Sequence, residues 1–521
     1  MSSRKTELPR PLDVRELIIG YACKRHLYFA YHGLLSGPGG KQTSGNPAVA
    51  ENTVPGLEDW EDHERFLDRQ RGRVRRAYDE RKSTGANATV IEDPLLRVEV
   101  AELQREGNAV AATVVTSAAS PKRSALLEAA AAYWILRGAD AEVLITVRLV
   151  YLNRSYTPEA PDRELFITED VTPHVAGMAQ SMGPRLDALS DYLRQPRGVV
   201  EDDPARCDKP DRCPVCSDGL EASGEDDIFT LFRGRDKALP LYRRGIRRLA
   251  EIPKDSNLGR RQRIQIHSQR NGTIHLEPEA LETFLSKLSF PLAFLDFEAV
   301  QEAVPRLPLS KPWQHLPFLF SLHRLEEPAG AEETFSGVLN HSSYLCRGGL
   351  ESLEELSTQL VAALSGVQCI LVYNREMESR SLSYLSRRFP ALAGALVEAA
   401  DRLVDLYPPF QAFTLYHPNQ RGSVSLKRVL PALTDLDYGD VRFRDGRSAS
   451  LAYYWAHLDD DGPLTKKDRE WVDRELVSYC TLDTLGLAKL LEAMNGLLIR
   501  AQKKGPTHGA GPLSELSLSA E

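Results

Sequence analysis

Hydrophobic and polar positions along the first part of the chain follow helical and strand periods in turn. Apolar residues at helical spacing within 11–33 predict an amphipathic helix that ends near a cysteine, Cys23, and a charged helix follows over 58–82. Gly107-Asn108 predicts the turn of a hairpin, and Gly138 predicts the end of an alanine-rich helix. The alanine-rich helix is predicted over 122–138. Strands are predicted over 89–91, 95–103, 109–116 and 141–152. This order predicts an α/β core.

The second part of the chain, from 286 to about 500, shows the same mixture of periods and predicts a second α/β domain. Residues 160–200 are expected to be helical, and the Gly, Pro, Ser and Ala content of 501–521 predicts a disordered tail. The strands of the second domain are predicted at 291–298, 316–324 and 368–373, and its helices near 350–365, 376–388 and 466–496.

Length and composition set the class of protein. A chain of 521 residues is too long for one core, so two or three domains are expected. The sequence contains no apolar run long enough to span a bilayer, and its polar N-terminal residues give no export signal, so we expect a cytoplasmic protein that does not bind membranes. The net charge of −8 argues against coating nucleic acid by bulk charge but leaves room for a local basic groove.

Two acids within residues 291–300 are the starting point of the functional hypothesis. Asp296 and Glu298 are two positions apart, so in a strand they leave the same face. Two carboxylates held together beside apolar neighbours repel each other unless a cation or a proton lies between them. A divalent metal satisfies that requirement. The alternative is a strand end at which both acids face solvent.

Two further patterns fit the same site. After the third predicted strand, Asn374 and Glu378 are four residues apart and can share one face of a helix. In the last predicted helix, Tyr479 and Asp483 have the same spacing. Glu376 competes with Glu378 as the acid of its segment. On its own, the pair Tyr479 and Asp483 would be an ordinary pair on a helix surface.

Taken in order, Asp-x-Glu, Asn-x-x-x-Glu and Tyr-x-x-x-Asp resemble the motifs of DEDD exonucleases. These are RNase H-like 3′–5′ exonucleases, and tyrosine in the last motif marks one subclass. The resemblance covers about 286–500 and implies two Mg²⁺ or Mn²⁺ ions held by carboxylates. It implies that Tyr479 orients the attacking water and that Asn374 shapes the site. Glu378 departs from the pattern, because the second-motif acid is usually Asp. The implied metal ligands are Asp296, Glu298, Glu378 and Asp483.

Four of the seven cysteines form another candidate site, since a cytosolic chain uses cysteine for metal or redox chemistry sooner than for disulfides. Cys207, Cys213 and Cys216 lie close together, and Cys23 lies far upstream. One early cysteine and a late group of three resemble the iron–sulfur motif of RecB-like nucleases and imply a [4Fe–4S] cluster. Four thiolates suit a structural Zn²⁺ as well, and free thiols are the remaining alternative.

The first domain resembles a restriction-endonuclease-like nuclease whose own chemistry is lost. The family pattern needs an acid, an acid-x-Lys pair on a neighbouring strand, and a helix that often begins with Gln. Glu99 can supply the first acid, but Val114-Val115-Thr116 stands in place of acid-x-Lys, and alanines at 129–132 fill the region of the Gln. The combination of a RecB-like half and a DEDD-like half also resembles an uncharacterised bacterial two-domain family, in which the stretches here numbered 422–431 and 479–484 recur.

A basic stretch precedes the acidic strand. Residues 231–270 concentrate arginines around Phe232 and Tyr242, which is typical of a surface that holds single strands by phosphate contacts and stacking. A solvated helix with paired charges is the alternative. Lys427, after a glycine-containing turn, is either a further phosphate contact or a solvated lysine. The arginines expected to contact nucleic acid are Arg243, Arg244, Arg247 and Arg248.

The sequence therefore predicts a RecB-like domain over 1–230, an arginine-rich connection over 231–285, an RNase H-like exonuclease domain over 286–500, and the tail. The expected reaction is metal-dependent hydrolysis of phosphodiester bonds of DNA or RNA from single-stranded 3′ ends. Helicases and repair or defence proteins are the implied partners. Two other hypotheses stay open: a non-catalytic nucleic-acid-binding protein, and an interaction protein that docks onto a repair or defence complex.

Overall fold

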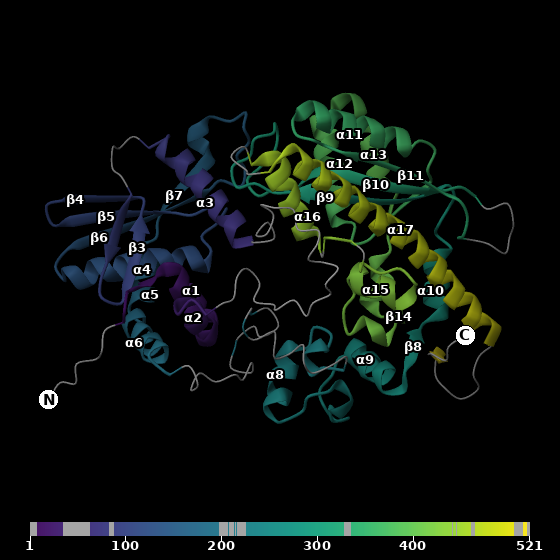
Figure 1. Ribbon diagram of the computed structural model, residues 1–521, viewed down its shortest axis with the longest axis horizontal. Helices are drawn as coiled ribbons and strands as arrows, with labels where there is room; N and C mark the ends of the chain where they lie inside the picture. The colour runs from purple at the N-terminus through teal and green to yellow at the C-terminus, as the bar shows by residue number, and fades with distance from the viewer. Residues whose placement is uncertain are drawn as a thin grey trace. The chain divides into compact units, whose positions relative to one another are not determined.

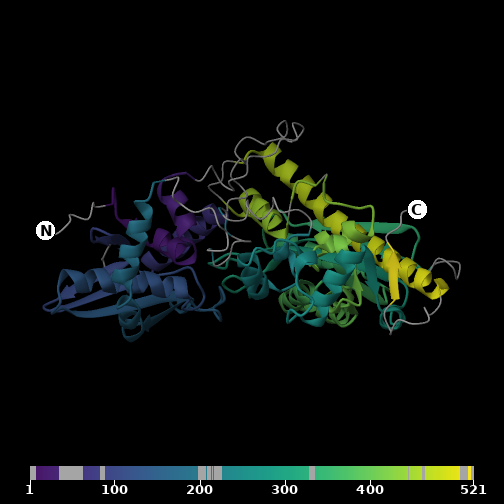
Figure 2. The same ribbon diagram turned by 90° about the horizontal axis from the view of Figure 1, so that it is seen from below.

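The computed structural model shows a mixed α/β protein, which confirms the predicted class (Figures 1 and 2). Two compact units divide the described residues: unit 1 contains those up to 215 together with 301–314, and unit 2 contains 226–300 and those from 315 onwards. The described residues are 8–34, 63–82, 88–196, 207, 213, 215, 226–327, 335–439, 441–443, 445–459, 464–504 and 514–517.

The two units differ from the predicted domains in two places. Residues 231–285, predicted as a separate connection, belong to unit 2, where they fold into helices and a strand. Residues 301–314, predicted within the C-terminal domain, belong to unit 1. There Glu302 pairs with Arg73 of α3 (His63–Asp79), and the Ala303 N–H donates to a glutamine of the same helix at 2.9 Å.

Unit 1 is built on two small sheets with helices packed against them. One sheet has the strand order β1-β3-β2 and the other β4-β5-β6-β7, in which β4 and β5 form a hairpin at the predicted turn and β5 pairs with β6 in parallel. Buried alanines of α4 share a hydrophobic core with both sheets. Besides α3, the elements are β1 (Leu12–Asp13), α1 (Val14–Ala22), α2 (Lys24–Tyr31), β2 (Thr89–Glu92), β3 (Leu96–Val100), β4 (Glu102–Glu106), β5 (Ala109–Val115), α4 (Arg123–Ala139), β6 (Leu144–Leu152), β7 (Phe166–Asp170), α5 (Thr172–Ala179) and α6 (Met182–Leu193).

The helix predicted to end near a cysteine does so: α1 ends at Ala22, and the extended backbone of Cys23 separates it from α2. Three other predictions for unit 1 are wrong. The strand predicted over 95–103 is divided between β3 and β4, which belong to different sheets. Gly138 lies inside α4 and does not end it, because the chain turns extended only at Asp140. Residues 160–200 contain the strand β7 as well as helices; this strand lies at a sheet edge with most of its residues exposed, so it lacks an apolar period.

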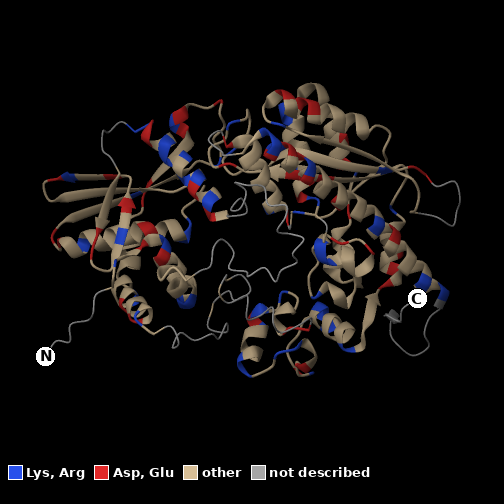
Figure 3. Cartoon of the chain, viewed as in Figure 1, with Lys and Arg blue, Asp and Glu red and all other residues tan. Residues whose placement is uncertain are grey.

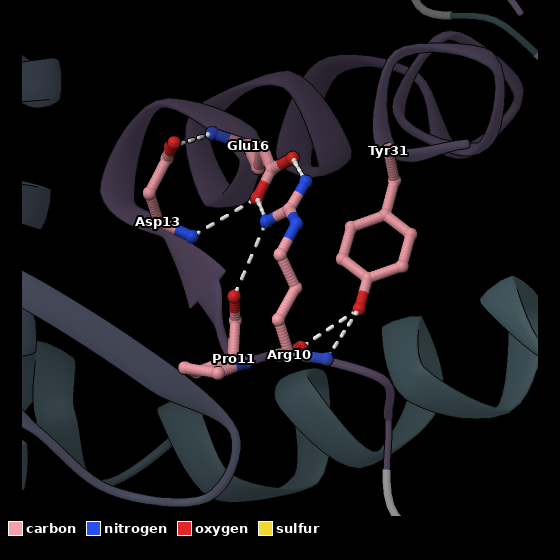
Figure 4. Close-up of polar contacts among 5 residues, drawn as sticks. All are labelled: Arg10, Pro11, Asp13, Glu16 and Tyr31. Carbon is pink, nitrogen blue, oxygen red and sulfur yellow. Dashed lines mark hydrogen bonds and ion pairs between the residues drawn. The ribbon is translucent and has the colours of Figure 1, made fainter. Parts of the chain in front are cut away.

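A polar cluster fixes the start of unit 1 (Figure 4). The Asp13 carboxylate accepts from the Glu16 N–H at 2.9 Å, and Glu16 accepts from the Asp13 N–H at 3.0 Å, which forms a capping box. Glu16 also accepts two guanidinium hydrogen bonds from Arg10, at 2.7 and 2.5 Å. The Tyr31 hydroxyl donates to the Arg10 carbonyl at 2.7 Å. Because Tyr31 lies on α2, the cluster ties α1 to α2 on either side of Cys23.

Unit 2 contains the main sheet, in the order β11-β10-β9-β12-β13. Neighbours among β9, β10 and β11 are antiparallel, whereas β12 runs parallel to β9 and to β13. Its elements are α8 (Arg235–Arg243), α9 (Arg260–Asn271), β8 (Thr273–Leu276), α10 (Pro278–Leu285), β9 (Leu292–Val300), β10 (Leu316–Leu325), β11 (Leu339–Leu345), α11 (Leu350–Ala363), β12 (Cys369–Val372), α12 (Glu376–Arg388), α13 (Ala393–Asp401), β13 (Leu403–Asp405), α14 (Tyr407–Ala412), β14 (Leu415–Tyr416), α15 (Leu426–Leu433), α16 (Gly446–Tyr453), a π-helical turn (Tyr454–Leu458), α17 (Lys466–Lys504) and β15 (Ser514–Ser517).

The predicted strands and helices of the second domain are present as β9, β10, β12, α11, α12 and α17. The alternation of side chains along β9 decides which face carries the acids. Leu292 and Phe294 lie in the core that apolar residues of α17 cover. Asp296 and Glu298 are in step with them and therefore point toward the α17 side. α17 itself is one continuous helix, yellow in Figures 1 and 2, and it contacts both β9 and β10.

The C-terminal residues are more ordered than predicted. α17 continues to Lys504, and β15 pairs antiparallel with β8, so the expected disordered tail is wrong for these parts of 501–521. The pairing satisfies backbone groups at an edge of the small β14-β8-β15 sheet. In the part of the chain that the structure describes, no helix combines the length and apolarity needed to cross a membrane.

The turn before α15 yields a stability prediction. Gly422 has a φ of +70°, and a Cβ there would lie 2.0 Å from the Thr230 carbonyl oxygen. We expect Gly422→Ala to lower the free energy of unfolding by about 3 kcal/mol, through left-handed backbone strain and collision. Gly394→Ala is the control, because a Cβ at that position in α13 meets nothing within 4 Å. Urea denaturation measures both variants, and equal loss of stability would contradict the prediction.

Candidate active site

Three carboxylates from β9 and α17 converge in unit 2. Asp296 and Glu298 project from β9, and Asp483 comes from the middle of α17. One oxygen atom of each residue lies within 4.8 Å of those of the other two. Glu298 and Asp483 are only 6% and 7% exposed. The structure thus brings the first and third predicted motifs together, in an arrangement of oxygen donors that suits a divalent cation.

Burial and mutual repulsion raise the pKa of these carboxylates. Burial is the main cause of the raised pKa of Asp296 and of Glu298; the charge of Asp483 adds to it for Asp296, and the charge of Asp296 adds to it for Glu298. Burial also raises the pKa of Asp483 to about 6, against a hydrogen bond from Tyr438 and the charge of Lys427. Like charges buried together are unfavourable without a compensating cation, so the site favours bound positive charge.

Glu378, on the first turn of α12, is not one of the carboxylates that lie within 4.8 Å of one another, but it is near enough for the charge of Asp296 to act on it. It is 2% exposed, and its pKa is raised by burial and then by the charges of Asp296 and Asp405. Its Oε2 atom has no hydrogen-bond partner among the described residues. An unpaired buried carboxylate oxygen is costly, so this atom marks a place for a cation or a proton. The competing Glu376 is exposed and pairs with Arg380, which favours Glu378 as the second-motif acid.

Asp405, which our sequence reasoning missed, fixes the turn that leads to Glu378. At the end of β13, its carboxylate accepts from the backbone N–H groups of Asn374 at 2.8 Å, Arg375 at 3.2 Å and Tyr407 at 2.9 Å. Asn374 has a φ of +65° and is exposed, so the structure places it in the turn itself. The sequence feature that could have identified Asp405 is an acid at the end of a short apolar strand.

Two tyrosines line the Asp483 side of the site. The Tyr438 hydroxyl donates to Asp483 Oδ1 at 2.5 Å. Tyr479 is 2% exposed, and its ring centroid lies 6.4 Å from that of Tyr438. Burial, followed by the charge of Asp483, raises the pKa of Tyr479, so its phenol stays protonated. Tyr479 was predicted from its helical spacing, whereas Tyr438 lies in a segment without a periodic pattern and was missed.

Lys427, the second residue of α15, is brought to the carboxylates by the fold. Its Nζ lies 4.4 Å from the ring centroid of Tyr479 and 4.8 Å from that of Tyr438. The alternative of a fully solvated lysine does not describe this half-buried position. Burial lowers the pKa of Lys427, and the charges of nearby acids oppose this effect. These acids are Asp483, Asp445, Glu298 and Asp296.

The start of α16 also approaches the site and was not predicted. Asp445 caps α16, since its carboxylate accepts from the Ser448 N–H at 2.8 Å, and its charge contributes to the raised pKa of Glu298. A Cβ at Gly446 would lie 3.5 Å from Glu298 Oε2, so the backbone of this helix start is next to the carboxylate.

A network of hydroxyl and imidazole groups holds α17 against β10. Ser321, the register partner of Asp296, has its Oγ 2.8 Å from Thr484 Oγ1 and 2.9 Å from His341 Nε2. His323 Nδ1 lies 2.8 Å from the same Thr484 hydroxyl. Because Thr484 follows Asp483 in the chain, this network fixes the position from which Asp483 meets the strand acids.

Three of the four predicted cysteines meet in unit 1. The sulfur atoms of Cys23, Cys207 and Cys213 lie within 4.8 Å of one another, and all three residues are buried. Cys23 also accepts a hydrogen bond from the His26 N–H at 3.4 Å, at the start of α2. Cys216 lies outside the described residues. Thiols at this separation can hold a metal ion or an iron–sulfur cluster.

Among the described residues, the positions of the expected RecB-like chemistry belong to neither group of possible metal ligands. Glu99 stands on the outer side of β3, with its side chain 63% exposed and 3.9 Å from Arg75. Val114 is buried in β5, and the alanines at 129–132 are buried in α4. This arrangement agrees with the predicted loss of chemistry, which stays a prediction.

The arginine-rich stretch over 231–270 contains exposed arginines and a buried aromatic residue. Arg243, Arg244, Arg247 and Arg248 are exposed at and after the end of α8, a region with repeated blue segments in Figure 3. Arg247 lies 3.8 Å over the Tyr242 ring. The expectation that Phe232 stacks on bases is wrong. This residue is 5% exposed, because its ring packs 4.8 Å from that of Phe413.

Comparison with protein families adds one finding. A family model described as "Domain of unknown function (DUF2779)" matches residues 293–425. The matched segment contains Asp296, Glu298 and Glu378 and ends before Lys427 and Asp483. Comparison with curated proteins gives no match.

The raised pKa of Asp483 predicts how the stability of the metal-free protein depends on pH. Its pKa rises from 3.8 to about 6 on folding, so protonation favours the folded state. The stability contributed by protonated Asp483 is fully present below about pH 4 and is lost as the pH rises through about 6. We expect a loss of up to about 3 kcal/mol from this residue. Urea denaturation in EDTA should therefore show a smaller loss in Asp483→Asn than in the wild type, and parallel curves would contradict this.

Proposed function

We propose that unit 2 is a metal-dependent 3′–5′ exonuclease with an RNase H-like fold, which hydrolyses phosphodiester bonds of DNA or RNA. The observation that carries the proposal is the meeting of Asp296, Glu298 and Asp483 within 4.8 Å, and the charge of Asp296 also acts on the buried Glu378. These residues belong to the three motifs that resemble those of DEDD exonucleases. The sheet, with three antiparallel and two parallel strands, supports the same fold.

The donor set fits divalent metal. Asp296, Glu298, Glu378 and Asp483 would hold two Mg²⁺ or Mn²⁺ ions, because all four offer carboxylate oxygens and Glu378 Oε2 has no protein partner among the described residues. Bound there, the ions would activate the attacking water and stabilise the leaving 3′-oxygen.

Side chains of the protein would position the metal ligands and the attacking water. The Tyr438 hydroxyl holds one oxygen of Asp483, which leaves the other oxygen for a ligand. Tyr479 keeps its phenolic proton and can donate or accept a hydrogen bond, so it would orient the water. The Asp405 carboxylate fixes the turn before α12, from which Glu378 reaches the site.

We further propose that unit 1 assists by binding nucleic acid and holds a [4Fe–4S] cluster, with Zn²⁺ as the alternative. The proximity of Cys23, Cys207 and Cys213 supports a cluster, with Cys216 as the proposed fourth ligand. The exposed arginines around α8, in unit 2, support contact with single-stranded 3′ ends. Helicases and repair or defence proteins are the proposed partners, in the cytoplasm.

A second candidate function keeps the fold without the chemistry. Glu378 stands where Asp is usual in the second motif, and this observation favours a nucleic-acid-binding or scaffolding protein of a repair or defence complex. A binding protein of this kind would show no cleavage that depends on divalent metal.

Nuclease activity is tested with a 3′-labelled single strand and Mn²⁺. Asp296→Ala and Asp483→Ala should each lower the rate by about 10³-fold or more, because each removes a proposed metal ligand. Glu378→Ala should also lower it strongly. Glu376→Ala is the matched control on the same helix turn and should retain the wild-type rate, since this side chain is exposed and paired with Arg380. Equal degradation by all of these proteins would refute the catalytic assignment.

The cluster is tested on protein purified without oxygen. We expect a brown protein with iron and sulfide bound, and Cys23→Ser or Cys213→Ser should lose most of the iron because each removes a thiolate ligand. Cys346→Ser is the control, since this buried thiol lies outside the group and contacts the Ser352 carbonyl. Zinc in place of iron would overturn the choice of cluster, and the absence of both metals would overturn the site.

A further inference from the structure

We propose that Lys427 is a resident counter-cation of the carboxylate site, and that divalent metal binds in competition with its positive charge. This inference rests on the metal site of the proposed function and adds a residue that sets how tightly that site holds metal. The metal-free protein would then carry its own partial substitute for the missing ions.

The position of the ammonium group carries the inference. Lys427 Nζ lies over the rings of both Tyr479 and Tyr438, at 4.4 and 4.8 Å from their centroids. Tyr438 is the residue whose hydroxyl donates to Asp483 Oδ1 at 2.5 Å. The rings that hold the ammonium therefore border the carboxylate group, and cation–π attraction adds to the attraction by the acids.

The charge of Lys427 acts on the whole acidic group. It favours the ionised form of Asp296, Glu298 and Asp483, in each case against the effect of burial. The pKa of Glu378 differs from those of the three acids, because the charges that act on it are those of Asp296 and Asp405 and not that of Lys427. The ammonium thus compensates the negative charge of Asp296, Glu298 and Asp483. Glu378 receives no such compensation, and its Oε2 atom has no hydrogen-bond partner among the described residues.

The backbone before Lys427 is fixed, so the charge cannot withdraw by a movement of the turn. The Tyr373 hydroxyl, at the end of β12, donates to the Val424 carbonyl at 2.6 Å. The Gly422 N–H donates to the Tyr416 hydroxyl at 3.1 Å. Gly422 also packs so closely against Thr230 that a Cβ would not fit. A divalent ion that enters among Asp296, Glu298 and Asp483 therefore meets a positive charge that already acts on the same three carboxylates.

The test is a Mn²⁺ titration of the full-length, chelator-treated protein without nucleic acid. Lys427→Met keeps the length of the side chain and removes its charge, so we expect it to bind Mn²⁺ about tenfold more tightly than the wild type. Lys427→Arg keeps the charge and should stay within about twofold of the wild type. Arg428→Met is the matched control, because it removes a charge from the next, exposed residue of α15. It should not change the affinity.

Thermal melting gives a second measurement that does not depend on the affinity. Loss of the counter-cation should lower the melting temperature of Lys427→Met in EDTA, and saturating Mn²⁺ should raise it more than it raises that of the wild type. A variant that folds only with Mn²⁺ would also support the proposal. One that stays unfolded with Mn²⁺ would contradict it, because the metal should replace the lost charge.

The outcomes separate this inference from the proposed function. Wild-type protein that binds Mn²⁺, with unchanged or weaker binding in Lys427→Met, would refute the counter-cation and leave the metal site in place. Absence of Mn²⁺ binding in both the wild type and Lys427→Met would refute the metal site as well as the inference.

Discussion

The burial of several carboxylates in one place is the constraint on which the rest of unit 2 depends. Asp296 and Glu298 point toward the core-covering helix α17 because they are in step with Leu292 and Phe294. Asp483 comes from that helix and adds a third charge within 4.8 Å. Each neighbouring feature reduces the cost of this arrangement: the Tyr438 hydroxyl, the Lys427 ammonium and the network around Thr484 that keeps α17 in place. What the protein does not supply is a partner for Glu378 Oε2 within its described residues.

The parts of the site that could be predicted from sequence are those with strong local patterns. An apolar strand with acids at i and i+2, and a helix with Tyr479 and Asp483 at i and i+4, identify both their element and their shared face. Asp405, Tyr438 and Asp445 could not be found in this way. They lie at the end of a three-residue strand, in an irregular segment and at a helix cap, and they reach the site only through tertiary packing.

The same reasoning explains where the fold predictions failed. β7 and β11 are edge strands in which at most one residue is buried, so no apolar alternation marks them. The end of the first helix near a cysteine was predicted, but the helix α2 that begins directly after Cys23 was not. There the Arg10, Glu16 and Tyr31 cluster holds α1 and α2 together, and the cysteine between them is placed beside Cys207 and Cys213. Unit 1 therefore gathers thiols, whereas unit 2 gathers carboxylates, and these two sets of donor atoms suit metals of different chemistry.

The central claim is that the four acids of unit 2 form a site for divalent metal. It is tested most directly by a crystal structure of the protein grown with Mn²⁺, with anomalous diffraction used to locate the ions. We predict one anomalous peak among Asp296, Glu298 and Asp483 and a second between Asp296 and Glu378, each at coordination distance from carboxylate oxygens. Crystals in saturating Mn²⁺ without a peak at these carboxylates would contradict the claim.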